Sequence, residues 1–409
     1  MTIYLPERIV IAPSGFKESL SAVEVADAIS CGIRRVLPSA RIDSFPVADG
    51  GEGSIDILST RPGTKVHSLN VQGPVGTEVN AQWLEFVDHG VAVVEMAQSA
   101  GLSLVPRDMR DPGATCTFGV GQVIADVLDH GIRSIVVGCG DSGTSDGGAG
   151  ALRALGLKIL NQDGEEIARG GSALSQAAVL DASEMHPAIA ECDIVLACNM
   201  FNVLTGPHGV AEVFGPQKGA SPQQVKVLGA ALEKWASLLE DTFHPQSDIR
   251  GAGSGASGGL GAGLMAIGAT AKNRFEVLLE DLPSGSNEGL SDLIEQADLV
   301  ITAEGAIDFQ TPKGKVPAEI ARRAQQAGVP VLGLAGTLGE GAPRVHEVGV
   351  AAIESIMTSP MPLEDAVVKG RELLIDAAER SMRMLQLGSI LAARSEDRHF
   401  DRYRSRFVA

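Results

Sequence analysis

Aromatic side chains are scarce in this 409-residue chain: Phe, Trp and Tyr make up only 4% of it, although 44% is apolar and glycines number 49. The core must therefore be built from Val, Ile, Leu and Ala, with many glycines left for tight loops. This balance is typical of an α/β protein. Because the length exceeds the usual size of a single core, we expect two domains.

Positive charge is also in short supply, since the net charge is −18. A chain this acidic is not expected to bind nucleic acids or membrane surfaces broadly, and an anionic ligand would need local cations. No apolar run approaches the roughly 20 residues that span a bilayer. The first residues lack the cationic segment and long apolar stretch of a signal peptide.

Cysteine pairing is not indicated, because the five cysteines are odd in number and none lie in a Cys-x-x-Cys pair. We therefore expect free thiols in a reduced, cytoplasmic protein. The eight histidines show no metal-ligand spacing. The chain also lacks a P-loop motif and the H-R-D and D-F-G signatures of protein kinases.

The two ends of the chain show the same alternating pattern of secondary structure. Residues 1–75 and 290–409 alternate apolar strands with amphipathic helices, and we predict that they share one doubly wound parallel sheet. Residues 76–289 differ, because 79–86 and 91–96 are predicted as an antiparallel pair. This middle part is predicted to be a second domain inserted into the first. The mixed-charge last sixteen residues are predicted to be a solvated or frayed tail.

Four loops follow apolar segments or open helices, where ligands collect in α/β sheets. The first is PSGFKES, residues 13–19. A capping box from Ser21 to Glu24 explains Ser21 without a ligand. It does not explain Lys17 and Ser19, which are placed either to bind an anion or simply to face water.

The second loop is VADGGEGS, residues 47–54. Asp49 and Glu52 have the spacing of a helix cap, and Gly50 and Gly51 suit close backbone packing. The same residues could instead bring a ligand close and contact a cation or a hydroxyl group. Both interpretations remain open.

The third and fourth loops are rich in glycine. Residues 138–152, GCGDSGTSDGGAGAL, combine six glycines in thirteen residues with Asp141 and Asp146, a mixture suited to phosphates and Mg²⁺. Residues 250–264, RGAGSGASGGLGAGL, match G-x-G-x-x-G. No strand precedes them, so a dinucleotide site is weakly indicated. Close helix packing and another kind of phosphate loop remain alternatives.

Two more segments have loop composition. Residues 198–221 contain Lys218, and residues 302–317 contain Glu304, Asp308, Gln310, Lys313 and Lys315. Two acids followed by two lysines directly after a strand would suit a site that handles metal and phosphates.

Taken in order, these segments resemble the type I glycerate kinase family, the glycerate 2-kinases of bacteria. The matching pieces are APSGFKESLSA, ADGGEGS, GDSGTSDGGAGALRALG, LTGPHGVAEVFGPQKGA, GAGSGASGGLGAGL and ITAEGAIDFQTPKGKVP. The resemblance implies a flavodoxin-like domain made from both chain ends and an inserted mixed α/β domain, with the active site in the cleft between them. It also implies phosphorylation of D-glycerate to 2-phosphoglycerate with ATP and Mg²⁺.

The resemblance guides an assignment of roles. Predicted catalytic residues are Lys17, Asp49 and Asp146. The acceptor is expected at Ser19, Gly50, Gly51, Asn199, Asp308, Gln310 and Lys315. The nucleotide is expected at Asp141, Ser142, Gly143, Gly147, Gly148, Gly255, Gly258, Gly259 and Lys218. Glu52, Asp141 and Glu304 are the predicted metal ligands.

The chain departs from the family pattern at several positions, namely Ser14, Gly15, Glu18, Asn199, Ala303 and Ala306. A related acid such as erythronate or threonate is therefore an alternative acceptor. A non-catalytic nucleotide- or metabolite-binding paralogue and a nucleotide-dependent dehydrogenase are the other hypotheses. The expected partners are a small hydroxy acid and ATP, and a homodimer is one of the open oligomeric states.

Overall fold

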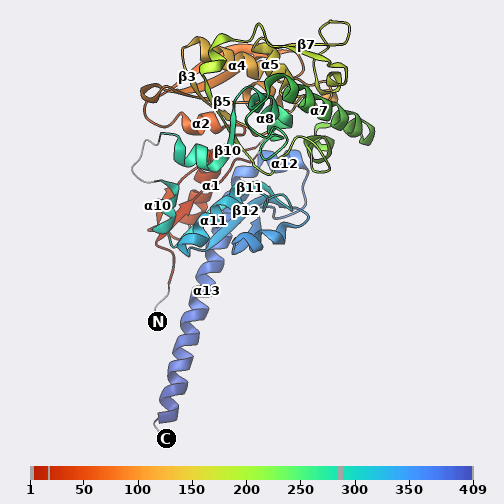
Figure 1. Cartoon of the computed structure of the whole chain (residues 1–409). Coiled ribbons are helices and arrows are strands. Elements are labelled where there is room, and N and C mark those ends of the chain that lie inside the picture. Colours follow the sequence, from red (N-terminus) through yellow and green to blue (C-terminus); the bar gives the residue numbers. More distant parts are fainter. Residues whose placement is uncertain (1–3, 17–18, 284–288, 408–409) are drawn as a thin grey trace. The chain divides into compact units, whose positions relative to one another are not determined.

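The computed structural model describes residues 4–16, 19–283 and 289–407, with side chains to Arg394 (Figure 1). The chain forms two compact units, Met1–Val47 with Ser286–Ala409, and Ala48–Gly285. We predicted that the first part would run to about residue 75. The division lies earlier because the strand that begins at Thr64 pairs within the second unit.

The first unit alternates strands and helices, as its sequence pattern predicts. Its elements are β1 (Arg8–Ile11), α1 (Ala22–Arg34), β2 (Arg41–Ser44), α10 (Leu290–Glu295), β11 (Leu299–Ile307), α11 (Val316–Ala327), β12 (Val331–Leu338), β13 (Ala352–Ser355), α12 (Leu363–Val368) and α13 (Gly370–Phe407). Among the described residues the sheet order is β13-β12-β11-β1-β2, and every pairing is parallel.

When these five strands are numbered 1 to 5 as they occur along the chain, the order across the sheet is 2-1-3-4-5. This is the flavodoxin-like order. Helix α1 begins at the predicted capping box, in which Ser21 accepts from the N–H of Glu24 and Glu24 accepts from that of Ser21. Helix α13 packs against α1, and a Cβ at Gly32 would lie 2.3 Å from the carbonyl oxygen of Ile375. Glycine at this position therefore sets the close approach of the two helices.

The second unit holds a mixed sheet with helices. Its elements are α2 (Ser54–Leu58), β3 (Thr64–Gln72), β4 (Glu78–Phe86), β5 (Val91–Glu95), α3 (Ala97–Ala100), α4 (Phe118–Asp129), β6 (Ser134–Gly138), α5 (Ala149–Ala154), β7 (Lys158–Leu160), β8 (Val179–Asp181), β9 (Asp193–Cys198), α6 (Val210–Phe214), α7 (Pro222–Phe243), α8 (Ala256–Ala266), β10 (Thr270–Asn273) and α9 (Arg274–Glu276). The described sheet has the order β10-β9-β6-β5-β4-β3.

Strand direction determines where the loops of this unit gather. Strands β5, β6, β9 and β10 are parallel, whereas β4 is antiparallel to both β3 and β5. The carboxyl ends of four neighbouring strands therefore meet at one edge of the sheet. The large core of the unit surrounds the fully buried Trp83 and Trp235.

The predicted α/β class is confirmed, including the antiparallel pair β4 and β5. Strand β10 escaped the sequence analysis because its four residues alternate between exposed and half-buried positions without an apolar run. No strand lies between α7 and the glycines at 253–258, which agrees with the weak dinucleotide signal. The predicted cleft stays a prediction. In the part of the chain described, no helix is long and apolar enough to cross a membrane.

Candidate active site

The loop at residues 48–53 packs against the loop that follows β6. The N–H of Gly140 donates to the carbonyl of Gly50 at 2.9 Å, and a Cβ at Gly140 would lie 2.4 Å from the Cα of Gly51. Both Gly50 and Gly51 are buried. The structure thus shows close backbone packing at these two predicted acceptor-binding glycines, one of the two interpretations that their sequence left open.

Asp49 directly precedes these buried glycines and is itself partly accessible to solvent. Its Oδ1 accepts from the N–H of Gly51 at 3.0 Å, and its Oδ2 pairs with Nη1 of Arg274 at 3.3 Å. Nη1 of Arg274 also donates to the carbonyl of Asp49. Sequence analysis missed Arg274, which directly follows the short strand β10. The pair supplies a half-buried carboxylate whose orientation is fixed by a cation.

Asp141 joins the same edge of the sheet. It is one of the described non-glycine residues with a positive φ, 52°, a backbone conformation that is uncommon outside glycine. Its Oδ2 accepts from the N–H of Glu52 at 3.1 Å. The structure therefore brings together three of the predicted acids, Asp49, Glu52 and Asp141, through two adjoining loops.

A buried carboxylate supports these loops from below. Glu95 ends β5, is 1% exposed, and accepts from the N–H groups of Gly53 at 3.2 Å and Ile55 at 3.0 Å. Burial raises the pKa of Glu95 to about 8, although the two N–H donors act in the opposite direction. Sequence analysis missed this residue, but an acid that ends the apolar run VAVVE was a usable signal.

Asp146, predicted to be catalytic, lies inside the second unit with no exposed surface. Its carboxylate accepts from the N–H and hydroxyl of Thr117, and from the N–H groups of Gly148 and Gly150, at 2.8–3.2 Å. Burial raises the pKa of Asp146. These contacts show that Asp146 stabilises the loop before α5. Because its carboxylate is buried and already bonded, we do not assign it the role of catalytic base.

Lys218 is likewise enclosed, at 2% exposure. Its Nζ donates to Oγ of Ser142 at 2.9 Å and to the carbonyl of Thr144 at 2.6 Å. Burial lowers the pKa of Lys218 to about 7, and the charge of Asp146 opposes that shift. The lysine therefore holds the glycine-rich loop in place, and Ser142 remains the half-exposed member of this group.

The remaining predicted nucleotide glycines are buried and pack against other parts of the unit. A Cβ at Gly258 would lie 1.9 Å from the carbonyl oxygen of Thr144, and one at Gly147 would lie 2.5 Å from the ring of Trp235. The N–H of Gly147 donates to the carbonyl of Gly258. Close packing thus accounts for the set Gly143, Gly147, Gly148, Gly255, Gly258 and Gly259. For the residues of the 250–264 loop, this is one of the alternatives stated above.

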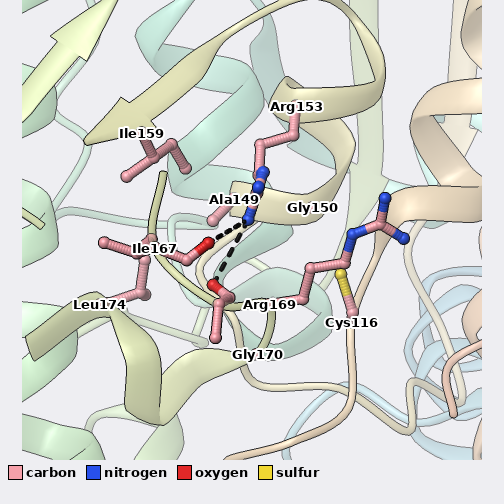
Figure 2. Close-up of a pocket in the computed structure, with 10 residues that line it drawn as sticks. Cys116, Ala149, Gly150, Arg153, Ile159, Ile167, Arg169, Gly170 and Leu174 are labelled. Atoms are coloured by element: carbon pink, nitrogen blue, oxygen red, sulfur yellow. Dashed lines mark hydrogen bonds between the residues drawn. The ribbon is translucent and has the colours of Figure 1, made fainter. Parts of the chain in front are cut away.

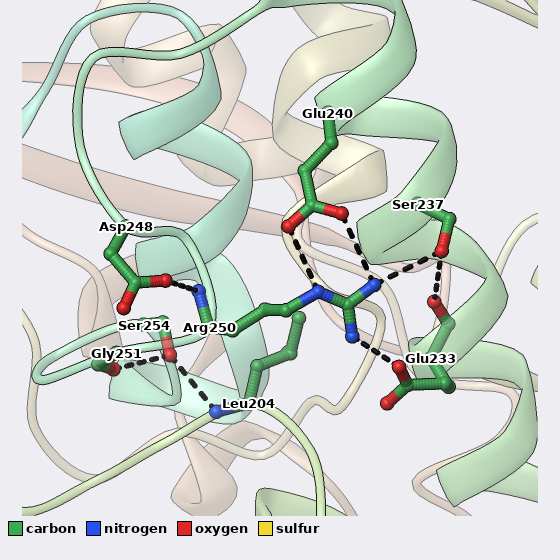
Figure 3. A network of polar contacts seen from close by, with 8 residues as sticks. All are labelled: Leu204, Glu233, Ser237, Glu240, Asp248, Arg250, Gly251 and Ser254. Carbon is green, nitrogen blue, oxygen red and sulfur yellow. Dashed lines mark hydrogen bonds and ion pairs between the residues drawn. The ribbon is translucent and has the colours of Figure 1, made fainter.

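The loop at 251–259 is anchored by Arg250 (Figure 3). Its guanidinium contacts the carboxylates of Glu233 and Glu240 and the hydroxyl of Ser237, all on α7, and its N–H donates to Asp248. These acids raise the pKa of Arg250, the hydrogen bond to Glu240 most strongly. The position where the glycine-rich loop begins is therefore fixed to the longest helix of the second unit.

Asn199 directly follows β9 at the same sheet edge. Its Oδ1 accepts from the N–H of Phe201 at 3.0 Å, and the side chain is half-buried. Phe201 is 76% exposed. Asn199 is thus accessible beside the acidic loops, as its predicted acceptor-binding role requires.

The first unit has its own polar cluster at the carboxyl end of β11 and in the loop that follows. Nζ of Lys315 lies 3.0 Å from Oε1 of Glu304 and 3.6 Å from Oδ1 of Asp308, while the hydroxyl of Thr311 donates to Glu304 at 3.4 Å. The N–H of Gln310 donates to Asp308. The structure therefore groups four predicted residues, and Thr311 is the member that sequence analysis missed.

The opening loop is only partly described. Oγ of Ser19 donates to the carbonyl of Val367 at 2.8 Å, and that of Ser14 to the carbonyl of Ala303 at 3.1 Å. These bonds explain both hydroxyls within the first unit. Lys17 and Glu18 lie outside the described residues, so the catalytic role of Lys17 stays a prediction.

A small cavity near α5 offers no competing site (Figure 2). Its volume is about 10 Å³, and Cys116, Arg153, Ile167 and Arg169 line it. Nη1 of Arg153 is already bonded to the carbonyls of Ile167 and Ala168. Burial raises the pKa of Cys116 to about 12, so its thiol is not expected to react. The space suits at most one water molecule.

Comparisons with known proteins agree with this architecture. A sequence model of the glycerate kinase family matches residues 9–386. The chain is 41% identical to the glycerate kinase of Halalkalibacterium halodurans over 90% of this chain and 96% of that one. It is 40% identical to the glycerate 2-kinase of Escherichia coli K12 over 93% and 98%. A crystal structure of a Salmonella typhimurium LT2 protein, named as a glycerate kinase 2, covers 93% of this chain and 98% of its own, with a TM-score of 0.72 and 39% identity.

These matches define a kinase that transfers phosphate to a hydroxyl group. The chain belongs to the glycerate kinase family.

Proposed function

We propose that this protein is an ATP-dependent kinase that phosphorylates the O2 hydroxyl of D-glycerate and forms 2-phosphoglycerate. The observation that carries the proposal is the acidic edge of the second unit, where Asp49, Glu52 and Asp141 adjoin Arg274 in a chain of this family. Relatives named glycerate kinase and glycerate 2-kinase support this choice of acceptor and of the O2 hydroxyl.

Phosphoryl transfer asks mainly for positioning and for compensation of negative charge. The acceptor hydroxyl oxygen attacks the terminal phosphorus of ATP, the bond from that phosphorus to the bridging oxygen breaks, and ADP leaves. The hydroxyl proton passes to the carboxylate of Asp49. Arg274 keeps that carboxylate oriented, since its guanidinium pairs with Oδ2 and bonds the Asp49 carbonyl.

The donor set fits Mg²⁺, a cation that takes oxygen ligands and keeps waters and substrate phosphates in its shell. Glu52 and Asp141 would hold it, and the role of Glu304 as a metal ligand stays a prediction. In the described residues no three His, Cys, Asp or Glu side chains group as a metal site, so one or two carboxylates plus phosphates is the expected arrangement. When bound, Mg²⁺ compensates the charge of the phosphates.

Cationic groups would meet the anionic ends of the substrates. Lys315 is held by Glu304 and Asp308, and Lys17 remains a candidate from the opening loop. The hydroxyl of Ser142 is oriented by Lys218, because an oxygen that accepts from the ammonium has its own hydrogen free to donate elsewhere. We also propose a cytoplasmic setting, in keeping with the five free cysteines.

A longer sugar acid, erythronate or threonate, is the second candidate acceptor. The observation that favours it is Ala306, a half-buried methyl side chain on β11 two residues beyond Glu304. A small side chain there leaves room beside the Lys315 cluster.

The test is a coupled assay of ADP release over glycerate, erythronate, threonate, lactate and tartronate, with NAD reduction measured in parallel. The product is then offered to enolase without a mutase, because enolase accepts 2-phosphoglycerate and not 3-phosphoglycerate. Glycerate-dependent ADP release with direct enolase turnover is the expected result. ATP binding without turnover of any acid would instead identify a non-catalytic paralogue.

A further inference from the structure

A groove of about 290 Å³ runs along the second unit between the segment after β9, helix α6 and helix α7. Its walls include Leu204 and Gly206 from the segment, Ala211 from α6, and Gly229 and Ala230 from α7. Leucine, alanine and glycine make up most of these walls, and Thr205 adds one hydroxyl-bearing side chain. Such walls suit a flat, largely apolar group better than a small acid covered with hydroxyls.

Gly229 is the residue that the fold does not explain. It lies in the middle of the 22-residue helix α7, where alanine is the better helix former. A Cβ built there meets only the Cβ of Ala211, at 3.8 Å, which is an ordinary contact. Because both packing and helix propensity would accept a side chain, the absence of one keeps the groove open.

Charged side chains lie at the same groove. Glu212 of α6 and Lys226 of α7 both line it and are exposed. Neither side chain has a hydrogen bond or an ion pair to any residue in the described part of the chain. A carboxylate and an ammonium at a groove with apolar walls can hydrogen-bond the amino, hydroxyl and ring-nitrogen groups of a nucleoside.

The groove adjoins the glycine-rich loop after Arg250. The N–H of Leu204 donates to Oγ of Ser254, at a distance of 3.0 Å; Figure 3 marks this bond with a dashed line. The side chain of Leu204 lies 2.5 Å from the place of a Cβ at Gly259. One residue thus forms both a wall of the groove and the packing partner of the loop. That loop in turn contacts the segment after β6, because the N–H of Gly147 donates to the carbonyl of Gly258.

We propose that this groove binds the nucleoside part of the phosphate donor, with the base against the wall at Gly229. The inference rests on the proposed kinase function, which requires a nucleotide. It gives a binding place to the adenosine part of ATP, which is not changed in the reaction.

The experiment uses the full chain and two replacements at one position. Gly229→Met fills the groove with a good helix former, and Gly229→Ala adds one methyl group. Adenosine binding is measured by calorimetry, and KM and kcat are measured with ATP and glycerate. Gly229→Met is expected to weaken adenosine binding and to raise KM for ATP at least tenfold, with kcat and KM for glycerate within twofold. Gly229→Ala adds a smaller group to the same wall, so it is expected to raise KM for ATP about threefold, between the unmodified protein and Gly229→Met.

Val227→Met is the matched control. Val227 lies two residues away on α7, so its side chain points to a different face of the helix, and it is 43% exposed. This variant is expected to bind adenosine like the unmodified protein. Melting curves establish that all three variants are folded.

Two outcomes would overturn the inference: a folded Gly229→Met variant with unchanged adenosine affinity and KM for ATP, or one in which KM for glycerate rises instead. Failure of the proposed function has another signature. Adenosine binding that Gly229→Met abolishes, in a protein that phosphorylates no acid, would remove the kinase and leave the groove assignment intact.

Discussion

The Nζ of Lys218 donates a hydrogen bond of 2.6 Å to the carbonyl oxygen of Thr144, and both residues are buried within the second unit. A buried ammonium is costly unless it is bonded. Here the bonds go to the loop that carries Asp141 and Ser142. Stability and loop position are therefore coupled through one side chain.

Lys218→Met tests this coupling. The pKa of Lys218 is about 7 in the folded protein, against 10.5 without burial. Between these values the unfolded chain holds a proton that the folded chain lacks, so unfolding free energy rises with pH by about 1.4 kcal/mol per unit. The variant loses this contribution. Denaturant melts of both proteins at pH 7, 8 and 9 should therefore show a growing difference in unfolding free energy, in favour of the unmodified protein.

The positioning role has its own readout. If Lys218 orients Ser142, then Lys218→Met and Ser142→Ala should each raise KM for ATP, and the double variant should raise it no further, because the two residues act as a unit. Fully additive effects in folded variants would show that the lysine supports the unit without orienting the hydroxyl.

Glu95 should produce the opposite pH dependence. Its pKa is raised from 4.5 to about 8 by burial. A raised carboxyl pKa gives stability that is full below 4.5 and is lost as the pH rises to 8, by about 1.4 kcal/mol per unit. Glu95→Gln removes the titration and keeps an acceptor for one N–H. Its stability relative to the unmodified protein should improve between pH 5 and pH 8.

Thermal or denaturant melts at pH 5, 6.5 and 8 measure this difference. Asp163→Asn, which changes an exposed acid elsewhere in the second unit, is a matched control that should show no such trend. If the stabilities of Glu95→Gln and the unmodified protein change in the same way across this pH range, the carboxyl group of Glu95 is not protonated in the folded protein.

Two aspartates that look alike in sequence should respond differently to amidation. Asp49→Asn removes the proposed proton acceptor and should lower kcat by roughly 10²–10⁴ with little change in melting. Asp146→Asn replaces a buried acceptor of four donors, so it should cost on the order of 1–3 kcal/mol of unfolding free energy, with kcat per folded molecule retained. Active-site titration and melting on the same samples separate the two effects.

The sequence alone predicted the fold class and most elements, because apolar runs and caps such as Ser21 with Glu24 are local signals. It also found the acidic loops at Asp49 and Asp141. It could not tell that Asp146 is fully buried whereas Asp141 is half-buried at the sheet edge. Nor could it tell that the side chain of Lys218 turns inward, or that Arg274 follows a strand of four residues. These properties depend on contacts between segments far apart in the chain.

Ala306 should control the choice of acceptor. This residue is half-buried on β11, near Glu304 and the Lys315 cluster. Ala306→Arg adds a planar cation that can bind a carboxylate at two points. We expect KM for glycerate to fall about tenfold, equivalent to about 1.4 kcal/mol, and KM for erythronate and threonate to rise because the added side chain fills their space. Steady-state kinetics with the three acids measure both changes. Ala306→Lys carries the same charge without the planar fork and should lower KM for glycerate less. Equal effects of Arg and Lys would assign the change to charge alone, and a uniform loss with all three acids would place Ala306 away from the acceptor.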